Sequence, residues 1–142
     1  MTTTNWAGTS LSSRAEILAT NLGSPVNAVA LTRERLYAGC QDGSVHIISQ
    51  AGREVILATT SPVLSMLRLR LNTEDQVVIS RQDGSVSLYL AAGRVELTGS
   101  DTDPVYCLAQ DDRNVYTGCR DGAVRKYDMT DLVRLVKLCN KK

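Results

Sequence analysis

Phenylalanine is absent from this chain of 142 residues, and tryptophan and histidine each occur once, as Trp6 and His46. A core with so few aromatic rings must be built from Val, Leu, Ile and Ala, which favours β-strands. A single histidine excludes any centre that needs two imidazoles. Gly-rich phosphate loops, a serine-nucleophile elbow and paired-Cys zinc signatures do not occur. These absences argue against an enzyme, a cofactor, a metal site and a small-molecule substrate.

Neither sign of charge is in excess, because 16 Lys and Arg offset 15 Asp and Glu. The net charge of +1 gives no general attraction to nucleic acid or to a membrane surface. The longest uncharged stretch, residues 17–32, is too short and too polar to cross a bilayer, and the first 13 residues lack the pattern of a secretion signal. Four cysteines in such a chain are expected to be reduced thiols, which predicts a cytoplasmic or nuclear location.

One pattern is written three times, as "CQDGSVHII", "RQDGSVSLY" and "CRDGAVRKY". The chain has three prolines, each followed by Val, and they precede the three copies in phase: Pro25, Pro62 and Pro104. Asp-Gly between two apolar runs predicts a two-residue hairpin turn in which Gly supplies the positive φ. A period of about 40 residues with short strands is typical of β-propeller blades.

Each repeat divides into four strand-like runs. The chain is therefore predicted to be all-β, with three four-stranded antiparallel blades at about residues 24–58, 61–98 and 103–139. The last run, residues 131–139, also fits a short amphipathic helix capped at Thr130 or Asp131. Residues 14–20 predict an extra strand ahead of the first blade, and residues 1–13 and 140–142 are expected to be tails.

Four features of these repeats resemble the WD-repeat β-propeller family: Pro-Val before the first strand, Gly39 and Gly118 near the end of the second, Asp-Gly at the hairpin, and Tyr127-Asp128 after it. The resemblance covers residues from about 14 to 139. It implies a rigid, non-catalytic scaffold that presents loops to proteins and peptides. The Trp-Asp and Gly-His dipeptides of that family are missing here, so the hairpin Asp residues are expected to accept hydrogen bonds from main-chain N–H groups instead.

Three blades are too few for a propeller, which closes with about four to eight. The outer faces of the first and third blades would then expose Val, Leu and Ile to water. The missing blades could come from a longer polypeptide, from a second copy of the chain or from other proteins, or the open arc could persist alone. The strand predicted at 14–20 could dock on another chain's blade, belong to a longer propeller or cover the open face of the first blade.

The resemblance also indicates where partners would bind, because such propellers commonly use the loops ahead of the first strand and the Asp-Gly hairpins. The binding residues expected at this rim are Gln41, Gln82, Arg120, Ser61 and Asp103. The turn-forming residues are assigned a structural role: Asp42, Gly43, Asp83, Gly84, Asp121 and Gly122. The alternatives are an enzyme-type propeller, and a nucleic-acid-associated subunit that uses the basic third repeat, including Arg120, Arg125, Lys126, Arg134 and Lys137.

Three other features have ordinary structural interpretations. His46 shares its repeat position with Ser87 and Arg125 and is expected on the surface. Cys40 and Cys119 share a position where the second repeat has Arg81, which predicts small buried strand residues and argues against a disulfide or a metal pair. Residues 101–104 read "DTDP", a turn sequence that is preferred here over a carboxylate site for a divalent ion.

Overall fold

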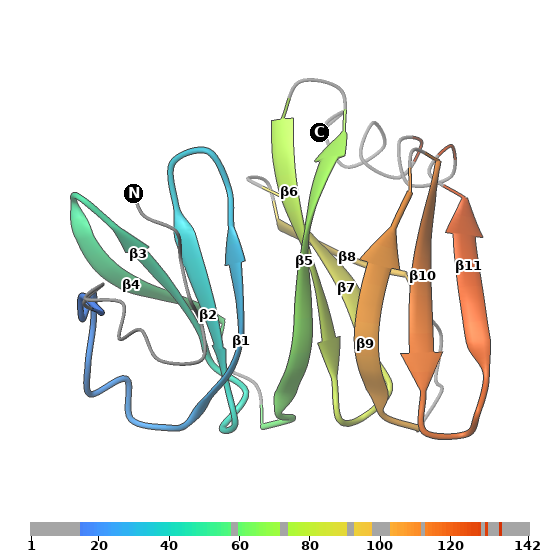
Figure 1. Cartoon of the computed structure of the whole chain (residues 1–142), viewed down its shortest axis with the longest axis horizontal. Coiled ribbons are helices and arrows are strands. Elements are labelled where there is room, and N and C mark those ends of the chain that lie inside the picture. Colours follow the sequence, from blue (N-terminus) through green and yellow to red (C-terminus); the bar gives the residue numbers. More distant parts are fainter. Residues whose placement is uncertain are drawn as a thin grey trace, which may run out of the picture.

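The computed structural model describes residues 15–57, 60–71, 74–90, 93–97, 103–111, 113–128, 130 and 134. The strands form three antiparallel sheets that stand side by side (Figure 1). Blade one contains β1 (Val26–Leu31), β2 (Leu36–Cys40), β3 (Val45–Ser49) and β4 (Gly52–Leu57). Blade two contains β5 (Val63–Leu71), β6 (Glu74–Arg81), β7 (Val86–Leu90) and β8 (Gly93–Glu96). Blade three contains β9 (Val105–Gln110), β10 (Asn114–Cys119) and β11 (Val124–Asp128). The predicted all-β fold with propeller-type blades in an open arc is confirmed.

Within each sheet the strands pair in chain order, and the first strands, β1, β5 and β9, lie next to one another. Each blade therefore has two faces. We call the face toward the next repeat the forward face and the opposite one the back face. Both faces of blade two are covered by its neighbours, whereas the back face of blade one and the forward face of blade three are not covered by another blade (Figure 1).

Blade three has three strands in the described part of the chain. The fourth run predicted at 131–139 lies outside the described residues, apart from Arg134, which has helical backbone conformation, as does Thr130. The Asp128 carboxylate accepts a hydrogen bond from the Thr130 N–H (2.7 Å), as the residue that caps a helix N-terminus does. Thr130 and Arg134 thus follow the helical alternative.

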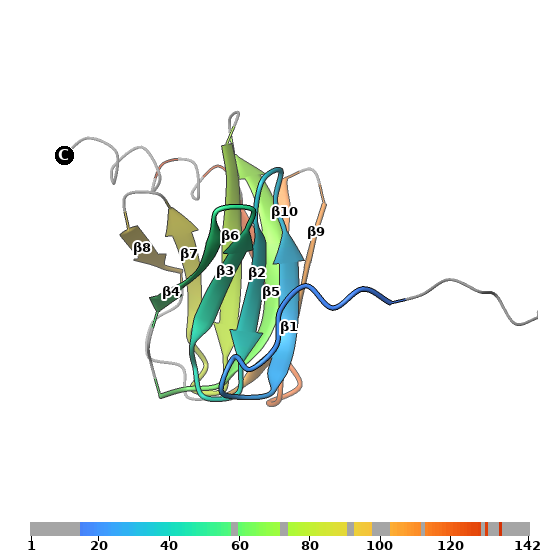
Figure 2. The same cartoon turned by 90° about the vertical axis from the view of Figure 1, so that its left-hand side faces the viewer.

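The extra strand predicted at residues 14–20 does not form over its described part, residues 15–20. These residues belong to no sheet, and they run away from the blades (Figure 2). Arg53 of β4 donates a hydrogen bond to the carbonyl of Thr20 (2.8 Å), but Ile17 and Leu18 remain 75% and 63% exposed. A strand needs a sheet edge that satisfies its main-chain groups, and this stretch pairs with no such edge.

The three Asp-Gly hairpins have the same geometry. Gly43, Gly84 and Gly122 have φ values of 92°, 88° and 86°, as expected for glycine in the left-handed region. In blade one, the Gly43 N–H donates to the Cys40 carbonyl and the Cys40 N–H donates to the Ser44 carbonyl. The loop is therefore three residues long, a turn followed by a glycine bulge, and the predicted two-residue turn is wrong by one residue.

Two aliphatic clusters hold the blades together. Between blades one and two, the buried residues are Ala30, Val45, Val63, Met66, Val77 and Ile79. Between blades two and three they are Leu69, Val78, Val86, Leu88, Val95, Val105 and Val115. The core is thus aliphatic, as the scarcity of aromatic residues predicts, and it lies between the sheets rather than within any one of them.

The structure corrects the surface position predicted for His46, which is only 6% exposed. His46 lies on an inner strand, opposite Ala38 of β2 and Val55 of β4, so the neighbouring strands flank it on both sides. Its Nε2 is 3.2 Å from the Ser44 hydroxyl. The imidazole is therefore a buried neighbour of the hairpin and does not point freely into water.

The described cysteines, Cys40, Cys107 and Cys119, are free thiols. Cys40 is fully buried, as predicted, whereas Cys119 is only half-buried. Arg81, which replaces them in blade two, is also buried, and its guanidinium donates to the Tyr89 hydroxyl (3.2 Å). Cys139 lies outside the described residues.

Candidate interaction rim

The hairpins and the Pro-Val segments lie at the same end of all three blades, the lower end in Figure 1. One main-chain hydrogen bond joins them in each blade. The N–H of the residue before the hairpin Asp donates to the proline carbonyl, in the pairs Gln41–Pro25 (2.9 Å), Gln82–Pro62 (2.9 Å) and Arg120–Pro104 (3.0 Å). The repeat phase of the prolines therefore has a structural cause. We call the surface formed by these loops the hairpin rim.

The residues ahead of the prolines complete this arrangement. The Ser61 hydroxyl accepts a hydrogen bond from the Asp83 N–H (3.1 Å), and Ser24 does the same for Asp42 (2.9 Å). Blade three has Asp103 at this position, and its carboxylate forms an ion pair with Arg120 (3.2 Å). The structure thus brings the predicted residues to one rim, with Ser61 and Asp103 engaged in holding it.

The side chains of Gln41, Gln82 and Arg120 are exposed on this rim. Their main-chain N–H groups hold the turns, and the side chains of Gln41 and Arg120 each make one further contact. Arg120 keeps about 60% of its side chain exposed despite its ion pair. Gln41 accepts a hydrogen bond from the Asn27 side chain (2.7 Å), which also donates to the Val63 carbonyl of blade two (2.9 Å).

Asn27 is a rim residue that the repeat pattern could not reveal. The equivalent positions after Pro-Val hold Leu64 and Tyr106, which have no amide to make the same contacts. No periodic signal therefore marks Asn27. Its two hydrogen bonds join the rim of blade one to the first strand of blade two.

The hairpin aspartates are committed to the turns. Asp42, Asp83 and Asp121 each accept a hydrogen bond from the N–H two residues later, at 3.0, 2.9 and 2.9 Å. This confirms the main-chain donors predicted for them, and in blade one the Ser44 hydroxyl adds a further bond (2.6 Å).

These hydrogen bonds also set the charge of the rim. Hydrogen bonds from the Ser44 side chain and main chain lower the pKa of Asp42, and the Ala123 N–H lowers the pKa of Asp121. Partial burial alone would raise the pKa of Asp83, but hydrogen bonds from Ser85 outweigh it, so this pKa is also lowered. All three carboxylates are therefore ionised at neutral pH.

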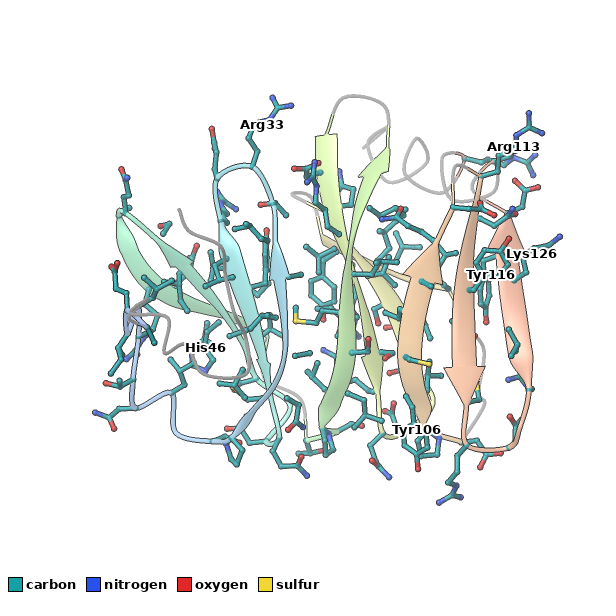
Figure 3. All side chains as sticks on the ribbon, in the orientation of Figure 1. Arg33, His46, Tyr106, Arg113, Tyr116 and Lys126 are labelled. Carbon is teal, nitrogen blue, oxygen red and sulfur yellow. The ribbon has the colours of Figure 1, made fainter. Side chains whose placement is uncertain are left out.

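The basic residues of the third repeat do not gather into one patch among the described residues. Arg120 lies on the hairpin rim, Arg113 lies at the opposite end, and Lys126 points away from blade three (Figure 3). Arg125 is tied to Asp121 by an ion pair (3.2 Å). A continuous phosphate-binding track would need these cations on one surface.

Chemistry-bearing clusters are sparse elsewhere in the described part of the chain. Within it, no three His, Cys, Asp or Glu side chains are grouped so as to hold a metal ion. Asp101 of the "DTDP" segment lies outside the described residues. Among the described residues, no helix has the length and apolar character needed to traverse a membrane.

Both open faces of the arc carry exposed apolar side chains, as the repeat count predicts. On blade one, Val29, Leu31 and Val55 are 59%, 65% and 54% exposed. On blade three, Val124 is 76% exposed. Figure 2 looks onto the open back face of blade one, formed by β1 to β4.

Comparison with known proteins supports the repeat assignment. A profile of the family described as "WD domain, G-beta repeat" matches residues 94–128. Proteasomal ATPase-associated factor 1 of Homo sapiens is 39% identical over 107 residues, covering 68% of this chain and 25% of that protein. The Gallus gallus protein of the same name is 35% identical over 105 residues, with 67% and 25% covered. This chain thus spans about a quarter of the length of the curated relatives it matches.

Solved structures share the fold at low sequence identity. BBS1N, crystallised in complex with ARL6DN, matches with a TM-score of 0.58 and 16% identity, covering 72% of this chain and 36% of that chain. The computationally designed Ika8 protein matches with a TM-score of 0.55 and 20% identity, covering 76% and 34%. In both cases the three blades correspond to about a third of a larger chain.

Proposed function

Because the chain belongs to the WD-repeat family, we propose that it is a non-catalytic scaffold for protein–protein interaction that works within a larger propeller or complex. The observation that carries this proposal is the hairpin rim. There, three equivalent side chains are exposed while their main chains and the neighbouring Asp and Gly residues maintain the turns. Rigid loops with freely variable side chains are suited to recognition rather than to catalysis.

The proposed partner is a proteasomal ATPase, because that is what the name of the curated relatives says they associate with. The proposal includes an intracellular location, which agrees with the free thiols of Cys40, Cys107 and Cys119. The hairpin rim would supply the contact, with Gln41, Gln82 and Arg120 as its central side chains.

The test is a binding assay between the full chain and purified proteasomal ATPase subunits, comparing wild type with Arg120→Glu. We expect Arg120→Glu to weaken binding at least about tenfold, because the substitution reverses an exposed charge at the centre of the contact. The thermal unfolding midpoint should change little, since an ion pair as exposed as Arg120–Asp103 contributes at most about 1 kcal/mol. Loss of stability equal to the loss of binding would make Arg120 a structural residue.

Two controls sharpen this test. Arg33→Glu makes the same charge change at the opposite end of the blades and should leave binding intact (Figure 3). The double variant Arg120→Glu with Asp103→Arg restores an ion pair of reversed polarity, so stability should recover while binding does not. A wild-type chain that binds no ATPase subunit would contradict the proposed partner, and a loss caused by Arg33→Glu alone would contradict the choice of rim.

A further inference from the structure

The contact between blades one and two shows how one repeat receives the next. Gly39 of β2 leaves room for Val63, the valine that follows the proline of blade two. A Cβ atom at position 39 would collide with Cγ1 of Val63 and lie 2.9 Å from its Cβ. Val63 is fully buried in this position. A missing side chain on one blade therefore forms a socket for the Pro-Val valine of the next.

A similar arrangement occurs in the contact between blades two and three. Ser80 stands three residues before the hairpin Asp of blade two, as Gly39 does in blade one. Its hydroxyl donates a hydrogen bond to the carbonyl of Val105 (3.0 Å), the Pro-Val valine of blade three. Val105 is 3% exposed. A small residue at this position thus receives the following valine in both contacts.

Blade three has a glycine at the same position on its open forward face, where Sγ of Cys107 would lie 2.7 Å from an added Cβ atom. Gly118 stands three residues before Asp121 and pairs with Cys107, as Gly39 pairs with Ala28. Beside it, Val124 is 76% exposed, whereas the equivalent Val45 and Val86 are fully buried. A following blade would remove this difference in burial.

Blade one carries the matching valine on its open side. Val26 follows Pro25 and is 47% exposed, whereas Val63 and Val105 are buried. Val29, four residues after Pro25, is 59% exposed, whereas the equivalent Met66 is 9% exposed. The chain therefore presents an exposed valine at one end and a matching glycine socket at the other.

We propose that two copies of the chain assemble head to tail, with Val26 of each copy packed into the Gly118 socket of the other. Each contact joins different faces, but a ring of two copies closes and contains six blades, within the range of known propellers. The assembly deepens the proposed role within a larger propeller, and it does not depend on what binds the hairpin rim.

The forward face of blade three has one cation where the other blades are apolar. Lys126 follows the hairpin Asp by five residues, as do Ile47 and Leu88, which are 4% and 0% exposed. The aliphatic part of a lysine can cover apolar surface while its amine stays in water. Lys126 can therefore remain at the edge of the proposed contact.

Sedimentation velocity of the full chain over a range of concentrations tests the proposal. The wild type should sediment as a species of twice the 15.4 kDa monomer mass. Val26→Asp and Val124→Asp should each raise the dissociation constant at least about tenfold, because they place a charge in an apolar contact. Neither side chain belongs to the buried core of the single chain, so folding should be retained. Gln50→Asp, in the exposed turn between β3 and β4 of blade one, adds the same charge and should leave the sedimentation of the chain unchanged.

Mixing the two variants tests the head-to-tail arrangement. A pair of Val26→Asp with Val124→Asp contains one unaltered contact, so the mixture should associate more strongly than either variant alone. A wild-type chain that stays monomeric at its highest soluble concentration would overturn the proposal. So would an assembly that responds to only one of the two substitutions, since that would indicate a symmetric face-to-face contact. Neither outcome bears on whether the hairpin rim binds a proteasomal ATPase.

Discussion

Blades two and three contain the same hairpin, but their forward faces lie in opposite environments. Val86 of blade two is fully buried, whereas Val124, at the same distance from its hairpin Asp, is 76% exposed. The sequences around the two valines differ little, "QDGSV" against "RDGAV". The difference in burial therefore comes from the neighbouring blade and not from the local sequence. One repeat specifies half of an interface, and the next repeat supplies the other half.

The largest expected effect tests the difference in burial between Val86 and Val124. Val86→Ala should lower the free energy of unfolding by about 2–4 kcal/mol, because it removes methyl groups from a filled core. Val124→Ala should change it by less than about 0.5 kcal/mol. Urea denaturation at concentrations where the chain is monomeric measures both. Equal losses would mean that Val124 is buried by something within the same molecule.

A smaller effect concerns the sockets. Gly39→Ala should cost about 1–3 kcal/mol, because the new Cβ would collide with Val63. Adding Val63→Ala should recover part of this loss, so a double-mutant cycle should give a clear coupling energy. At Gly118, a Cβ would meet only the Sγ atom of Cys107 at 2.7 Å, a side chain that can rotate away. Gly118→Ala should therefore cost less than Gly39→Ala, and the opposite order would contradict the socket.

The smallest effect is electrostatic and distinguishes two tyrosines at equivalent positions. Tyr37 packs against the core between blades one and two, whereas the Tyr116 hydroxyl donates to Asp111 (2.6 Å) on blade three. This hydrogen bond, with further ones from main-chain N–H groups, lowers the pKa of Asp111 to about 2. Tyr116→Phe should raise the pKa of Asp111 toward its ordinary value near 3.8, as measured by NMR titration of the carboxyl carbon.

The lowered pKa of Asp111 determines how the stability of the folded state depends on pH. A carboxylate with a depressed pKa stabilises the folded state at neutral pH. This contribution is lost as the pH falls from about 3.8, the pKa of the carboxyl group in the unfolded chain, through about 2, its pKa in the folded chain. The acid-induced loss of stability in this window should therefore shrink in Tyr116→Phe. Tyr37→Phe is the matched control and should leave the Asp111 titration unchanged.

Repetition made the architecture predictable from the sequence. Three copies of Asp-Gly and three of Pro-Val, in phase, were sufficient to predict the hairpins and the three blades, and the resemblance to WD-repeat propellers indicated the rim where the loops meet. The exposed outer faces followed from counting blades. Because the pattern occurs three times, a substitution in any one copy does not obscure it.

Features that occur in one repeat alone could not be predicted in this way. His46 occupies the repeat position of Ser87 and Arg125, and these two polar residues suggested that the position lies on the surface. The burial of a residue on an inner strand depends also on the strands that flank it, here β2 and β4. Asn27 joins two blades through contacts that its equivalents cannot make. The run at 14–20 has the composition of a strand, but a strand also requires a free edge at the right place.

The bond from each proline carbonyl to the residue before the hairpin Asp has a consequence for how such a surface can change. It uses main-chain atoms alone, so other side chains at positions 41, 82 and 120 would keep this hydrogen bond. In the proposed scaffold, binding specificity would therefore be able to change one blade at a time while the loop keeps its main-chain hydrogen bond.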